Sequence, residues 1–258
     1  MNNAFAIAGI VIKELYRRKD VYVLFILTML ICMVMASVNI FHDDKIVRYL
    51  KELCLLLIWV CSLVIAVTTT ARQIPMEREN RTLFPLLAKP LTRTELLLGK
   101  FLGCWLACGF ALVCFYAFFG VLAASREHHW PLINYLQAAG LHWAMLAVVI
   151  AFTLLGSLIF AAPSSNATIG FVLISFILVL GRHLNKVALQ LPEPRRSILY
   201  SVYYAMPHLE LFDVRDLIIH DWPPIAWTVC GVAALYALAY ASALLIGACL
   251  IFHRKAIN

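Results

Sequence analysis

The sequence has few charged residues: Asp, Glu, Lys and Arg make up 14% of its 258 residues, against about a quarter in a soluble domain. Hydrophobic residues make up 63% and form long runs, which excludes a single soluble domain and indicates a membrane-spanning chain. The formal net charge is +7. No soluble domain remains to bind nucleic acid, so we assign this charge to basic residues that flank membrane spans.

Nucleotide-binding and catalytic motifs are also missing. Thr94 stands where the first glycine of a P-loop ending in Gly99-Lys100 should be, and Phe101 where its Ser or Thr should be, so this route to ATP is excluded. The eight cysteines lie in or beside apolar runs, without a C-x-x-C or a zinc-type Cys/His cluster. We therefore expect no cofactor and no metal in this chain.

Six apolar runs predict an all-α membrane protein with six transmembrane helices, at roughly 20 residues per crossing. The runs are Val21–Phe41, Leu53–Ala71, Phe101–Ala124, Leu136–Ala162, Thr168–Leu180 and Ile225–Phe252. We expect the short fifth run to continue into the polar stretch after it; a re-entrant hairpin of the fourth and fifth runs is the alternative. The runs contain no Asp, Glu, Lys or Arg, which argues against a self-powered, ion-coupled mechanism. We place His142 at the membrane interface, with Trp143 in an aromatic belt.

The first 20 residues predict an interfacial helix. Apolar side chains from Phe5 to Leu15 and basic ones from Lys13 to Lys19 suit a helix in the headgroup plane; a frayed tail is the alternative. With both termini on one side, that side has twelve flanking Lys and Arg and the other has nine. This bias predicts that both termini are cytoplasmic. The chain is then one multi-pass domain, residues 1–258, and we expect it in the bacterial cytoplasmic (inner) membrane.

Small residues recur at every fourth position of two runs. Gly99, Gly103, Ala107 and Ala111 form one stripe, and Ala233, Ala237 and Ala241 another. Such stripes let helices approach closely, either inside one bundle or across a dimer seam.

The segment 182–224 is predicted to lie outside the cytoplasm and to form short amphipathic helices before the sixth run, interrupted by prolines. Its apolar side chains would cover the bundle, lipid or an extracytoplasmic partner. The candidates for such an interface are Tyr200, Tyr203, Tyr204, Leu209, Leu211 and Phe212. A different hypothesis, a lipid-modifying membrane enzyme, depends on His128 and His129 beside Glu127.

The cytoplasmic loop 72–100 is the longest polar interval between runs on the side of the termini. Pro75 suits a first helical position, and Glu77 and Glu79 suit the first turn. Thr92 and Glu95 match a capping box that starts a new helix into the third run. The loop therefore predicts a helical hairpin whose apolar stripe, Leu83 to Leu87, needs a partner; the membrane surface is the alternative.

These motifs resemble the permease subunits of ABC type-2 transporters over the whole chain. The matching residues are Glu77, Glu79, Asn80-Arg81-Thr82-Leu83, Leu86-Leu87, Pro90, Thr92-Arg93 and Gly99-Lys100. The family often has glycine where Arg81 stands. Met206–Phe212 is weakly similar to the subgroup linked to multicopper-enzyme and nitrous oxide reductase copper-site maturation.

The resemblance implies a non-enzymatic permease in a homodimer or heterodimer, driven by an ATP-binding-cassette ATPase that holds the ATP and Mg. It implies export, and a coupling helix over residues 76–89. The coupling residues it implies are Glu77, Arg78, Glu79, Arg81, Thr82, Leu83, Phe84, Leu86, Leu87 and Lys89. A mechanotransmitter that moves an extracytoplasmic partner, without transport, is the alternative.

Overall fold

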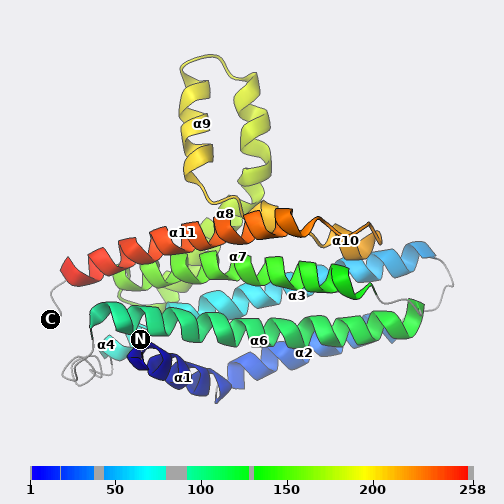
Figure 1. Ribbon diagram of the computed structural model, residues 1–258, viewed down its shortest axis with the longest axis horizontal. Coiled ribbons are helices and arrows are strands. Elements are labelled where there is room, and N and C mark those ends of the chain that lie inside the picture. The colour runs from blue at the N-terminus through cyan, green and yellow to red at the C-terminus, as the bar shows by residue number, and fades with distance from the viewer. Residues whose placement is uncertain (1, 18, 38–43, 80–91, 128–130, 255–258) are drawn as a thin grey trace.

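A computed structural model describes residues 2–17, 19–37, 44–79, 92–127 and 131–254, and the regular elements within these ranges are helices. The long helices lie side by side along one axis (Figure 1). Asn2, where the first helix begins, and Arg254, where the last one ends, lie at the same end of this bundle. We call it the near end, and the opposite end the far end.

The described elements, in chain order, are α1 (Asn2–Tyr16), α2 (Lys19–Ser37), α3 (Asp44–Ala71), α4 (Pro75–Glu79), α6 (Arg93–Glu127), α7 (Leu132–Ile159), α8 (Pro163–Gln190), α9 (Arg195–Ala205), the 3₁₀ helix η1 (Leu209–Phe212), α10 (Asp216–Ile219) and α11 (Trp227–Arg254).

Five helical stretches among the described residues are long and apolar enough to cross a membrane. They are Lys51–Glu79, Arg93–Ala124, Leu132–Ile159, Pro163–Gly181 and Trp227–Arg254. The all-α prediction is confirmed, and these stretches contain the second to sixth predicted spans almost in full. The first predicted span falls on α2, whose described apolar stretch, Phe25–Val34, is shorter. The fifth continues into the polar sequence as expected, since α8 extends to Gln190.

Helix α7 forms the centre of the bundle. Seven consecutive residues, Met145 to Ala151, are each at most 2% exposed. A helix that is apolar on every side and buried on every side must be surrounded by other helices. Its neighbours include α3, α6, α8 and α11.

Helix α1 packs along the near-end part of α6, so another helix covers its apolar side; its position in the headgroup plane stays a prediction. Ile7 and Val11 are buried there because α6 has Gly99 and Gly103 at the contact. A Cβ on Gly99 would lie 2.8 Å from the Ala4 carbonyl oxygen, and one on Gly103 would lie 2.7 Å from Val11 Cβ. The first part of the small-residue stripe on α6 therefore seats α1.

Replacing Gly103 by leucine should force α1 away from α6. Overpacking costs about 1–3 kcal/mol, which corresponds to a fall in melting temperature of roughly 2–12 °C for a chain of this size. Gly247→Leu on α11 is the matched control, because a Cβ there meets no atom within 4 Å. Thermal unfolding in detergent tests the pair, and equal melting temperatures would contradict this account of the stripe.

The segment between α8 and α11 has two parts. The second half of α8 and α9 form a hairpin that stands off the side of the bundle (Figure 1), and α9 has no buried residue. The chain then turns back into the bundle at η1, where Leu209 and Phe212 are each 2% exposed, and reaches the far end at α10. We call residues 206–222 the returning segment.

Candidate functional site at the near end of the bundle

A short helix follows the near end of α3. Helix α4 starts at Pro75 and ends at Glu79, so the predicted helix start at Pro75 is confirmed. Proline is suited to a first helical turn because its missing N–H is not needed there. Gln73, in the turn before α4, is buried, and its side-chain amide lies 3.4 Å from the Thr69 carbonyl.

A buried lysine joins α4 to α6. The Lys100 amine lies 2.6 Å from Glu77 Oε1 and donates to Gln73 Oε1 at 3.1 Å. The lysine side chain is 4% exposed and the Glu77 side chain 19%. A buried ammonium group needs such partners to offset its lost hydration. Lys100, Glu77 and Gln73 therefore form one polar joint, which we call the Lys100 joint.

The first turn of α6 is capped and also tied to α11. Glu95 accepts from the Thr92 N–H, and its own N–H donates to Thr92 Oγ1, at 3.0 and 3.2 Å. This confirms the predicted capping box. Arg93 donates to the Phe252 carbonyl at 2.5 Å and lies over the Phe252 ring. A cation on the last carbonyls of a helix stabilises that end. Arg93 therefore joins the start of α6 to the end of α11.

Asn166 connects three further helices at this end. Its side-chain amide lies 3.1 Å from the Thr153 carbonyl of α7 and 3.4 Å from the Ala71 carbonyl at the end of α3. The asparagine belongs to the first turns of α8 and is 1% exposed. Gly156 makes room for it, since a Cβ there would collide with Asn166 Oδ1.

These contacts link four helices at the near end. Helix α4 is joined to α6 through Lys100, and α6 is joined to α11 through Arg93 and to α1 through its glycines. Coupling between distant sites is carried by packed helices and polar contacts of this kind.

The predicted coupling residues fall into two groups. Glu77, Arg78 and Glu79 lie on α4, and only Glu77 belongs to the Lys100 joint. Arg81, Thr82, Leu83, Phe84, Leu86, Leu87 and Lys89 lie outside the described residues. Lys100, Gln73, Arg93 and Asn166 were absent from the predicted site. The sequence does carry a signal for Lys100, which directly precedes a long apolar run. A lysine at the start of such a helix needs a polar partner.

His142 lies inside the bundle, which corrects its predicted position in an interfacial belt. It is 2% exposed, and its Nε2 lies 2.8 Å from Ser62 Oγ. Trp143 stacks on Trp105, and each indole N–H donates to the other residue's carbonyl at 3.0 Å. His142 is therefore enclosed by the bundle, whereas Trp143 is only partly buried.

Ser62 has two neighbours for its single hydroxyl proton. Its Oγ lies 2.8 Å from the Trp59 carbonyl oxygen and 2.8 Å from His142 Nε2, so a bond to the carbonyl competes with any proton transfer to the histidine. The histidine pair of the enzyme hypothesis, His128 and His129, lies outside the described residues.

The returning segment carries ionisable groups into the bundle. Arg215 and Asp213 form a bidentate pair, with Nε–Oδ1 and Nη2–Oδ2 distances of 2.7 and 2.9 Å. The guanidinium lies 5.5 Å from the Trp59 ring centroid. Trp59 is eight residues along α3 from the far-end Lys51, which is about 12 Å at the helical rise. The charged side chains of Asp213 and Arg215 therefore lie beside the middle part of α3, although they belong to a segment between two spans.

The six residues predicted for an outer interface also separate. Leu209 and Phe212 pack in the bundle core, which removes them from any partner surface. Tyr204 and Leu211 are exposed, and Tyr200 and Tyr203 are partly exposed.

The comparisons with known proteins agree with this architecture. The model of the ABC-2 family transporter proteins matches residues 5–255. A search of curated proteins finds no match to the chain. The match includes α4, the Lys100 joint, the returning segment and every membrane-length helix described above. The chain therefore belongs to the ABC-2 family of transporter proteins.

Proposed function

We propose that this chain is the membrane permease subunit of an exporter driven by a separate ATP-binding-cassette ATPase, which acts on α4 and the residues that follow it. The observation that carries the proposal is the Lys100 joint. It ties the short helix α4, which follows the end of α3, to the membrane-length helix α6 by a 2.6 Å ion pair at the near end. A passive linker between two spans has no need of a buried ion pair.

The proposed working unit is a dimer of permeases, homomeric or heteromeric, in the bacterial inner membrane. Both termini, α4 and the Lys100 joint then face the cytoplasm, where the ATPase holds ATP and Mg. This chain contributes no catalytic residue. ATP-driven closure of the ATPase pair pushes α4, and α6 carries the displacement to α1 and α11.

A second candidate function is favoured by the hairpin of α8 and α9. The hairpin stands off the bundle (Figure 1), and Tyr204 is 71% exposed. In this alternative the chain transmits ATPase motion to an extracytoplasmic partner and transports nothing itself. Removing Tyr200, Tyr203 and Tyr204 together by alanine substitution would then abolish partner binding and leave the coupled ATPase intact.

The experiment that tests the proposal is co-purification with the ATPase, followed by ATPase assays in proteoliposomes. Changing Leu83, Leu86 and Leu87 to aspartate should abolish both assembly and coupled hydrolysis, because the ATPase would lose its apolar contact. The matched control is Ile198→Asp, at an exposed apolar residue of α9, which should change neither assembly nor coupled hydrolysis. Assembly that survives the triple change would exclude the coupling role.

A further inference from the structure

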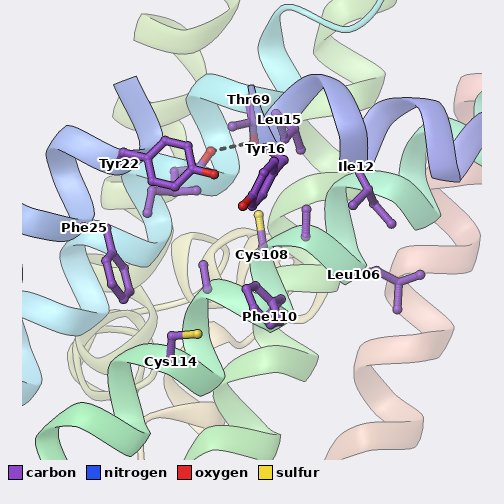
Figure 2. A pocket seen from close by; sticks show the side chains of 13 residues that line it. Ile12, Leu15, Tyr16, Tyr22, Phe25, Thr69, Leu106, Cys108, Phe110 and Cys114 are labelled. Atoms are coloured by element: carbon purple, nitrogen blue, oxygen red, sulfur yellow. Dashed lines mark hydrogen bonds between the residues drawn. The ribbon is translucent and has the colours of Figure 1, made fainter. Parts of the chain in front are cut away.

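A cavity of about 400 Å³ opens at the corner between α1 and α2. Figure 2 shows side chains from α1, α2, α3 and α6 around it. Those that shape it are Leu15 and Tyr16 of α1, Tyr22 and Phe25 of α2, and Leu106 and Phe110 of α6. Its size falls within the range of about 300–1,000 Å³ for small-molecule sites.

The interior of this corner cavity is apolar. Its walls are mostly aliphatic and aromatic side chains, with the thiols of Cys108 and Cys114. The one hydroxyl deep in the wall, on Thr69, donates to the Ile65 carbonyl at 2.6 Å and is therefore satisfied. The interior has no unmet polar group to orient a polar ligand, so it suits a hydrocarbon chain.

The mouth of the cavity has a different chemistry. Tyr16 and Tyr22, 73% and 40% exposed, meet edge to face there with ring centroids 5.8 Å apart. Arg17 directly follows Tyr16, and Lys19 precedes Tyr22 by one helical turn on the same face. Residues 13–20 include four basic and two acidic residues. The basic side chains belong to the turn beside the cavity and not to its lining. An apolar interior next to two tyrosine hydroxyls and a net basic turn fits an amphiphile with an anionic head.

We propose that the corner cavity binds one anionic phospholipid, with an acyl chain inside and its phosphate at Lys13, Arg17 and Lys19. The surroundings support a lipid as the source, because Phe5 and Ile10 on the outer side of α1 are 59% and 65% exposed. Basic pockets between membrane helices are known to hold acidic headgroups. The bound chain would fill the space between α1, α2 and α6 and hold the corner in place.

Native mass spectrometry of the full-length protein in mixed micelles tests this site. The probes are palmitoyl-oleoyl phosphatidylglycerol and phosphatidylcholine, offered in equal amounts. The wild-type protein should retain one phosphatidylglycerol per chain, with at least roughly tenfold preference over phosphatidylcholine, because the acidic headgroup meets three basic side chains. Equal retention of the two lipids would overturn the proposal.

Two variants separate the interior from the mouth. Ala107→Trp fills the cavity and should reduce lipid retention at least about fivefold, whereas Ala243→Trp on the exposed side of α11 should leave it unchanged. Substituting Lys13, Arg17 and Lys19 with glutamine, all exposed and so tolerated by the fold, should remove the preference for phosphatidylglycerol. The proposal would be overturned if Ala107→Trp and the triple glutamine variant both retained phosphatidylglycerol as the wild-type protein does. Lipid on monomers but not on dimers would also overturn it, by placing a second copy in the cavity.

Discussion

Lys100→Met is expected to uncouple the transporter. The change leaves the Glu77 carboxylate and the Gln73 amide oxygen in a largely buried place without the amine that they share. Removing one partner of a buried ion pair costs about 3–5 kcal/mol, and the 19% exposure of Glu77 places this case at the lower end. We expect a fall in melting temperature of roughly 6–12 °C and, since coupling free energies are about 1–3 kcal/mol, a loss of ATPase coupling of about tenfold.

Lys51→Met separates the loss of stability from the loss of coupling. Lys51 is a second buried lysine, at the far end, 3.6 Å from Asp221. Its removal should lower the melting temperature and leave coupled hydrolysis in the folded fraction near the wild-type rate. The double variant Lys100→Met with Glu77→Met should regain stability, because an apolar pair replaces a buried ionic one at little cost, but not coupling. Wild-type coupling in the Lys100→Met protein would exclude the Lys100 joint as the route of the signal.

The spans could be predicted because their signal is local. Each apolar run is long enough to cross a bilayer, and the capping box at Thr92 and the helix start at Pro75 depend on residues within one turn. The order of helices around α7 could not be predicted in this way. It depends on contacts between residues distant in sequence, such as Gly99 with Ala4 and Arg93 with Phe252.

Two predictions concern residues whose neighbours are set by other helices. Apolar side chains on α1 and a histidine beside a tryptophan on α7 are compatible with the membrane interface and with the interior of a bundle. Gly99 and Gly103 decide the neighbour in the first case, because they let α1 approach α6. Ser62 decides the second, because it gives His142 a buried partner. In both cases the deciding residue lies on another helix.

The returning segment shows the same limit for charges. The six apolar runs contain no Asp, Glu, Lys or Arg. The structure nevertheless brings Asp213 and Arg215 beside Trp59 of α3. Polar side chains on α7 bind the end of this segment and the residues after it. Asn134 donates to the Trp222 carbonyl, and Gln137 forms hydrogen bonds with both backbone groups of Ile225. The segment is thus anchored at the far end, and its internal Asp213–Arg215 pair neutralises the charge that it brings beside Trp59.

Asp213→Asn should release the inner part of this segment. The asparagine side chain is neutral and has one acceptor oxygen, so it cannot replace the carboxylate that binds the guanidinium through two oxygens. Arg215, whose side chain is 20% exposed, then remains a poorly compensated cation beside Trp59. We expect a loss of about 2–4 kcal/mol, less than for a fully buried pair. Amide exchange in η1 and α10 should accelerate roughly 30–1,000-fold, as measured by hydrogen–deuterium exchange mass spectrometry.

The location of the faster exchange distinguishes a local release from general unfolding. Amides of α7 and of the first turns of α6 should keep their protection, because Asn134, Gln137 and the Lys100 joint are untouched. Glu193→Gln at the exposed turn before α9 is the control and should change neither region. Replacing Asp213 and Arg215 together by leucine should restore protection, because it removes the uncompensated charge. Unchanged exchange in the Asp213→Asn protein would mean that the charge balance at Arg215 is not needed to hold the segment, and that apolar packing of Leu209 and Phe212 is sufficient there.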